Sequence, residues 1–168
     1  MTRTPAEIDA FLAAPKCLFG PLEWLDKGST AKLGSALFDD QGAVIGGATL
    51  VSTANVETPV QRGDAVLLLD GLVVQRLAVR PRGFHVNPTA HPIPAELRGL
   101  RCEPEHTRLY AWADNRHWPR DPRRTLAARP LAREPNSMGA AFNLFLAECG
   151  IEATLPEAPW RPKLEFPS

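Results

Sequence analysis

The feature that most constrains the fold is an Asp-Gly pair between two runs of branched apolar residues. Asp70-Gly71 separates residues 64–69 from residues 72–80. Both central residues of a two-residue hairpin turn take positive φ, which aspartate and glycine tolerate better than most residues. Val and Leu side chains in the flanking runs suit strands that are covered on one face. The sequence therefore predicts a β-hairpin here.

A second hairpin is predicted immediately before the first. Residues 34–39 and 43–53 flank Asp40-Gln41-Gly42, and Gly46-Gly47 within the second run indicates a β-bulge. Because all connections between these four runs are short, we expect them to form a four-stranded antiparallel meander.

One helix is predicted on each side of the meander. Thr4, Pro5 and Glu7 form a capping-box helix start, and Pro15 ends that helix. Near the other end of the chain, Asn136 or Ser137 caps a helix that Gly150 ends. Its apolar residues follow the 3.6-residue period: Met138, Ala141, Phe142, Phe145, Leu146 and Cys149.

The expected architecture is a single α+β domain over residues 1–168. Both helices would pack on one face of the meander, with a long irregular segment between the sheet and the C-terminal helix. At 168 residues the chain can bury a core without a metal or a disulfide. It has no signal-peptide pattern and no apolar run near 18 residues, so we expect a cytoplasmic protein without a membrane partner.

The irregular segment gathers most of the residues suited to chemistry. Residues 84–118 hold all four histidines, Cys102, two of the four tryptophans and the only tyrosine. Irregular segments held by a rigid scaffold often carry function. Between residues 76 and 133 there are also 12 arginines and no lysine, against five acids. If the chain performs chemistry, we expect it in this segment.

Cys102 is the candidate nucleophile. The three cysteines lack CxxC spacing, which argues against structural zinc and a disulfide framework. Cys17 and Cys149 are expected to be packing residues. Arg98, Arg101 and His106 would lower the pKa of the Cys102 thiol, whereas Glu103 and Glu105 would oppose them. A half-exposed cysteine without a role is the alternative.

The histidines do not have metal-ligand spacing. His85, His91, His106 and His117 form neither an HxH nor an HxxxH pair, so we expect no metal. A general acid–base role, with Asn87 stabilising an oxyanion, needs spatial convergence that spacing does not establish. The alternative is that these side chains brace the irregular backbone.

The order of these elements resembles that of the ubiquitin-conjugating (E2) family, in a divergent bacterial form. In that family a His-Pro-Asn motif follows the fourth strand, and the catalytic cysteine follows about ten residues later. Here His91-Pro92 precedes Cys102, and Gly99 lies three residues before it. Ile93 stands where the family has its asparagine. His85-Val86-Asn87 offers a His-x-Asn directly after the last strand, and Trp118-Pro119 is similar to the family's later Trp-Pro.

The resemblance implies that Cys102 carries a ubiquitin-like protein as a thioester and transfers it to an amine. Asn87 would stabilise the oxyanion, and His85 or His91 would organise the loop. The partners implied are a ubiquitin-like protein and an E1-like activating enzyme, and no cofactor is needed.

A non-catalytic or toxin-like protein is the rival interpretation. Segment 98–124 would then bind RNA or an acidic partner through arginines and aromatic rings. The candidate contacts are Arg98, Arg101, His106, Arg108, Tyr110, Trp112, Arg116 and Trp118. The aromatic residues could instead fasten the segment to the sheet. A structural interaction module is a third interpretation.

Overall fold

A computed structural model describes residues 3–118 and 126–163. The helices are α1 (Pro5–Ala13), α2 (Trp112–Asn115), α3 (Met138–Glu148) and the 3₁₀ turn η1 (Ala95–Leu97). The long strands are β3 (Thr30–Asp39), β4 (Val44–Asn55), β5 (Arg62–Leu69) and β6 (Leu72–Val79). The short strands are β1 (Lys16–Leu18), β2 (Leu25–Asp26), β7 (His85–Val86), β8 (Arg101–Cys102), β9 (Arg108–Tyr110) and β10 (Arg129–Pro130).

Eight of these strands form one antiparallel sheet. Their order is β1-β3-β4-β5-β6-β9-β10, and β2 also pairs with β3. The α+β class is therefore confirmed, but the sheet has eight strands rather than the four that were predicted. The added strands have only two or three residues, which is too short for a period of two to show in the sequence. β7 and β8 form a separate two-stranded ribbon.

The predicted turns are present. Asp70 and Gly71 have φ of 50° and 77°, as a type I′ hairpin requires. The β3–β4 ladder shifts its register between Ala36 and Phe38, opposite Gly46-Gly47. The bulge prediction is therefore confirmed.

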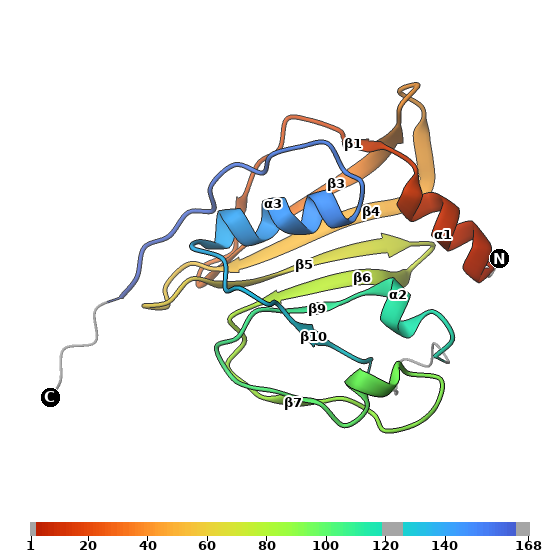
Figure 1. The fold of residues 1–168 in the computed structure, drawn as a ribbon. Coiled ribbons are helices and arrows are strands. Elements are labelled where there is room, and N and C mark those ends of the chain that lie inside the picture. Colours follow the sequence, from red (N-terminus) through yellow and green to blue (C-terminus); the bar gives the residue numbers. More distant parts are fainter. Residues whose placement is uncertain (1–2, 119–125, 164–168) are drawn as a thin grey trace, which may run out of the picture.

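One hydrophobic core joins the sheet to the two longer helices. Alternate residues of the strands, among them Leu33, Leu50 and Leu67, are buried with Ile8 of α1 and Phe145 of α3. α3 lies across the sheet in Figure 1, and α1 lies near one end of it. The intervening residues, such as Val51 and Val66, are half-buried on the opposite face.

Both helix starts have the predicted caps. The Thr4 hydroxyl accepts from the Glu7 amide, and the Glu7 carboxylate accepts from the Thr4 amide. The Ser137 hydroxyl accepts from the Ala140 amide at 3.0 Å, so Ser137 rather than Asn136 caps α3.

A buried lysine completes the C-terminal end of α1. The Lys16 ammonium donates to the carbonyl oxygens of Phe11 and Leu12, which the last turn of the helix leaves without partners, and to that of Ala14, which follows the helix. Burial lowers the pKa of Lys16. No local capping pattern marks this contact, because the lysine belongs to the next strand, β1.

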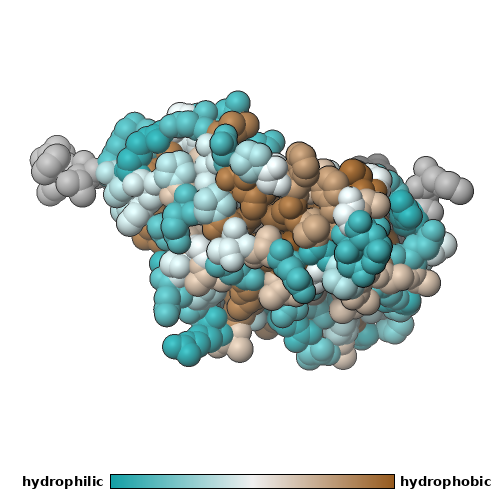
Figure 2. Space-filling model, turned by 90° about the horizontal axis from the view of Figure 1, so that it is seen from above, coloured by the Kyte–Doolittle hydropathy of each residue, from teal (hydrophilic) through white to brown (hydrophobic). Residues whose placement is uncertain are grey.

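Apolar groups also reach the surface. Seen from above, hydrophobic residues gather in the middle of a face whose rim is hydrophilic (Figure 2). Phe19, which follows β1, is 63% exposed and stacks on Phe38 with ring centroids 5.2 Å apart.

Among the described residues, no helix has the length and apolar character needed to cross a membrane.

Candidate functional site

Two sets of strand pairs bring the predicted site residues together. In the β7–β8 ribbon His85 lies opposite Cys102. In the main sheet Arg76 lies opposite Tyr110, and Ala78 lies opposite Arg108. Cys102, Tyr110, Ala78 and Ala128 form a small buried cluster separate from the main core. Through Cys102 the ribbon therefore packs against strands β6 and β9 of the sheet.

Cys102 lies inside this cluster. Its side chain is 1% exposed, and its Sγ lies 3.8 Å from the carbonyl oxygen of Ala128. Burial raises the pKa of the thiol, although the charge of Arg108 partly opposes that effect. The prediction of a lowered pKa was wrong, because pairing in β8 turns the side chain inward while neighbouring charges stay at the surface. A buried, protonated thiol is a weak nucleophile.

Asn87 acts as a clamp within the fold. Its amide nitrogen donates to the carbonyl oxygens of Leu97 and Ala128, both at 2.8 Å. Its amide oxygen accepts from the Ala128 backbone nitrogen at 2.7 Å. The side chain is 2% exposed, and these bonds occupy both ends of the amide. The proposed oxyanion donor is therefore already engaged by backbone groups.

Asn115 forms a second clamp, which sequence reasoning missed. Its amide nitrogen donates to Ala111 and Ala127 carbonyls, both at 2.9 Å, and its oxygen accepts from the Ala127 nitrogen at 2.8 Å. Two asparagines thus hold the adjacent residues Ala127 and Ala128 as a neighbouring strand would. The one sequence signal for such a clamp is an asparagine in an irregular segment, because its side chain readily bonds backbone groups.

His85 also braces this cluster. Its Nε2 lies 3.0 Å from the Leu126 carbonyl oxygen, which only accepts, so Nε2 carries the proton. Its ring meets Tyr110 edge-on at 5.2 Å. Burial, followed by the charge of Arg108, lowers the pKa of His85, which favours the neutral ring near pH 7. His91 is exposed, and within the described residues no hydrogen bond joins it to Cys102, Asn87 or His85.

The aromatic residues of the predicted binding segment do not form an exposed stacking surface. Trp112 is 4% exposed, and Tyr110 and Trp118 are each 8% exposed. The Trp112 indole donates to Asp9 of α1 at 2.7 Å, and Arg116 pairs with the same carboxylate. The exposed stacking role is therefore wrong for these rings, since they fasten the segment to the rest of the protein.

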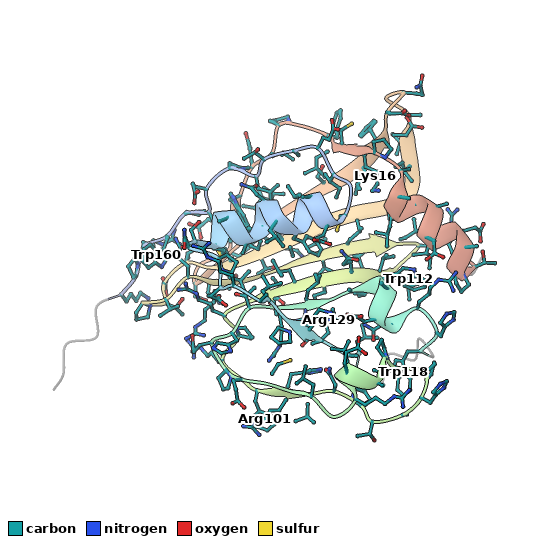
Figure 3. All side chains as sticks on the ribbon, viewed as in Figure 1. Lys16, Arg101, Trp112, Trp118, Arg129 and Trp160 are labelled. Carbon is teal, nitrogen blue, oxygen red and sulfur yellow. The ribbon has the colours of Figure 1, made fainter. Side chains whose placement is uncertain are left out.

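The other predicted contacts are dispersed. Arg98 donates to the Ile93 carbonyl, His106 is exposed, and Arg101 pairs with Glu103. The Arg101 guanidinium also lies 4.1 Å from the ring centroid of Phe84. In Figure 3 Arg101 extends from the lower rim of the molecule, at some distance from Trp112. The part of segment 98–124 beyond residue 118 lies outside the described residues.

Four arginines instead surround a cavity of about 220 Å³ on the sheet face opposite α3, and we call this site the arginine pocket. The arginines are Arg62, Arg76, Arg82 and Arg108, and the polar lining includes Asn55 and Asp64. Leu77 and Leu109 point into the main core, so Arg76 and Arg108, their neighbours along β6 and β9, project on this face.

The four arginines differ in what neutralises them. Arg62 pairs with Glu105 at 2.6 Å, and Arg76 pairs with Asp64 at 2.7 Å. Arg82 is exposed, and among the described residues it has no carboxylate partner within ion-pair distance. The pocket therefore has more positive than negative side chains along its lining.

Arg108 is the unusual member of this set. It is 7% exposed, and its guanidinium donates to the Tyr110 hydroxyl and to the Gly83 carbonyl, both at 3.1 Å. Within the described part of the chain, no carboxylate forms an ion pair with it. A buried charge is ordinarily paired with an opposite charge, because desolvation is costly. Among the described residues, Arg108 and Arg82 together therefore provide positive charge without a paired carboxylate beside an open cavity.

The arginine pocket can hold an anionic group. Guanidinium groups donate in a planar fork that matches carboxylate and phosphate oxygens. In the described residues, no group of three or more His, Cys, Asp or Glu side chains is arranged to hold a metal ion. In the sequence, Arg76 and Ala78 are two residues apart, as are Arg108 and Tyr110. This spacing indicates a shared site only once β6 and β9 are known to pair.

No known protein family, curated protein or solved structure matches the chain. The geometry of its own residues is thus the basis for a functional proposal.

Proposed function

We propose that this chain is a non-catalytic binding protein whose ligand places an anionic group in the arginine pocket. The observation that carries the proposal is Arg108, a buried guanidinium without a carboxylate partner among the described residues, which lines an open cavity. An anion would supply the missing charge. Arg108 and Tyr110 come from the segment predicted to bind RNA or an acidic partner, whereas Arg62, Arg76 and Arg82 come from outside it.

The neighbouring groups support binding rather than catalysis. His85 is held by the Leu126 carbonyl, and the Tyr110 hydroxyl accepts from Arg108. The Cys102 thiol is buried, with its pKa raised. These three side chains are therefore engaged or buried, and none of them is an activated nucleophile.

The proposal is tested by titrating the protein with labelled polyanions at several salt concentrations. We expect Arg82→Ala to weaken binding about tenfold, because an exposed charged contact to the ligand is lost. Arg133→Ala is the matched control, since Arg133 is exposed and does not line the pocket. Arg82→Lys, which retains the charge, should bind more tightly than Arg82→Ala. Equal affinity of wild type, Arg82→Ala and Arg133→Ala would contradict the proposal.

An E2-like thioester carrier is the second candidate function. Two observations favour it: His85 lies opposite Cys102 in the β7–β8 ribbon, and the N-terminal helix precedes an antiparallel meander. The Cys102 thiol would have to become exposed before the acyl group of a ubiquitin-like C-terminus could pass to it from the thioester of an E1-like enzyme.

A reducible adduct with a ubiquitin-like protein is the diagnostic result. The E2-like proposal requires Cys102→Ala to abolish this adduct and Cys149→Ala to leave it unchanged. An adduct that persists in Cys102→Ala would exclude Cys102 as the carrier.

A further inference from the structure

An exposed aromatic residue closely follows the arginine pocket along the chain. Phe84 is 56% exposed and directly follows Gly83, whose carbonyl oxygen accepts from Arg108. Arg82, two residues before Phe84, lines the pocket itself. Three consecutive residues thus have different roles: Arg82 lines the pocket, Gly83 accepts a hydrogen bond from Arg108, and Phe84 presents an exposed ring.

A second cation lies on this ring. The Arg101 guanidinium lies 4.1 Å from the ring centroid of Phe84, and Arg101 extends from the lower rim of the molecule in Figure 3. Arg101 also lies opposite Val86 in the β7–β8 ribbon, and Val86 is 47% exposed. The outer side of the ribbon therefore carries Phe84, Val86 and Arg101, which we call the Phe84 platform. Arg101 also pairs with Glu103 at 2.8 Å, so the platform is mainly apolar and aromatic.

The size of the pocket limits what part of a ligand it holds. Its volume of about 220 Å³ is below the range of about 300–1,000 Å³ that is typical of sites for whole small molecules. The pocket therefore fits one charged group of a larger ligand. The rest of that ligand has to continue over the surrounding surface, where the Phe84 platform lies.

We infer that this ligand is a single-stranded nucleic acid, with a backbone phosphate in the arginine pocket and an adjacent base on the Phe84 platform. The inference rests on the proposed function and specifies its ligand. Positive grooves beside exposed aromatic rings are how proteins bind single strands, because every base has a face that can stack. A duplex is excluded from this arrangement, since its bases already stack on one another. An acidic peptide would use the arginines but has no group that requires an open ring.

The inference is tested by fluorescence anisotropy with labelled RNA and DNA single strands of one sequence. An abasic strand of the same length measures the contribution of the phosphates alone. Phe84→Ala removes the ring, and Phe84→Tyr retains it. Phe19→Ala is the matched control, because Phe19 is similarly exposed and follows β1, which is far from β9 in the strand order of the sheet.

We expect Phe84→Ala to weaken binding of the normal strands about tenfold and to leave the abasic strand unaffected. Phe84→Tyr and Phe19→Ala should bind like wild type. Arg82→Ala should weaken binding of normal and abasic strands alike and reduce the slope of log affinity against log salt by about one. The RNA and DNA arms identify which nucleic acid is preferred.

Other outcomes overturn the inference and separate it from the proposed function. If Phe84→Ala binds normal strands like wild type while Arg82→Ala does not, base stacking is refuted and anion binding stands. Tighter binding of poly-glutamate or of duplex than of single strands would also refute the inference. If none of these polyanions binds the wild-type protein, both the inference and the proposed function are wrong.

Discussion

Replacing Asn87 by alanine tests whether this residue holds the fold together or takes part in chemistry. Its side chain makes three hydrogen bonds of 2.7–2.8 Å to backbone groups of Leu97 and Ala128, and it is 2% exposed. Alanine would leave two carbonyl oxygens and one amide without these partners. A buried hydrogen bond of this kind contributes about 1 kcal/mol, so we expect a loss of about 3 kcal/mol.

That loss is large enough to measure. In a protein of this length, 1 kcal/mol corresponds to about 2–4 °C in Tm, so Asn87→Ala should lower Tm by about 6–12 °C. Urea unfolding followed by far-UV circular dichroism would give the free energy of unfolding directly. Asn87→Asp keeps one acceptor but loses both donors and faces a carboxylate toward two carbonyl oxygens. It should be at least as unstable as the alanine variant.

Two comparisons make this result specific. Asn115→Ala breaks the equivalent bonds to Ala111 and Ala127 and should cost a similar amount. His91→Ala, at an exposed position nearby, should leave stability unchanged. The clamp assignment is refuted if Asn87→Ala unfolds at the same urea concentration as wild type. If that variant also failed to transfer a thioester, the oxyanion role implied by the E2-like resemblance would be supported instead.

Three further predictions follow from burial and charge. In native protein, alkylation read by mass spectrometry should label exposed Cys17 and spare Cys102, so rapid labelling of Cys102 would contradict its burial. Hydrogen bonds from Arg116 and Trp112 lower the pKa of Asp9, so this carboxylate stabilises the fold above the ordinary carboxyl pKa of about 4 and loses that effect as pH falls through its lower folded value. The stability difference between wild type and Asp9→Asn in urea should therefore shrink below about pH 4, and a constant difference would count against the ion pair. Ser52 has a buried hydroxyl without a hydrogen-bond partner among the described residues, so Ser52→Ala should raise the unfolding free energy by about 1 kcal/mol, and a loss would indicate a bond.

Much of the central sheet could be predicted because its signals are local. The Asp70-Gly71 turn, the apolar runs beside it and the capping residues Thr4 and Ser137 each act within a few residues of chain. The first predicted strand began four residues too late. In the structure β3 begins at Thr30, and the alternation of buried and exposed residues already starts there. Such boundaries depend on which partner strand is present, and that is a tertiary property.

The candidate site was harder to predict because its parts come from distant segments. Proximity in sequence suggested that Arg98, Arg101 and His106 would act on Cys102. In the folded chain Arg108 has that effect on the pKa of Cys102, and β8 turns the thiol inward. The burial of Trp112 and Trp118 could not be predicted either, since an irregular segment has no period from which burial can be read.

The sequence by itself determined the α+β class, the two hairpins and both helix starts, because turn chemistry and capping act over a few residues. The tertiary structure decided which side chains face each other. Pairing of β9 with β6 placed Arg108 beside Arg76, and the β7–β8 ribbon buried Cys102 while leaving Phe84 exposed. The physical reason is that burial and charge depend on neighbours brought together by long-range strand pairing. No local pattern in the chain encodes those neighbours.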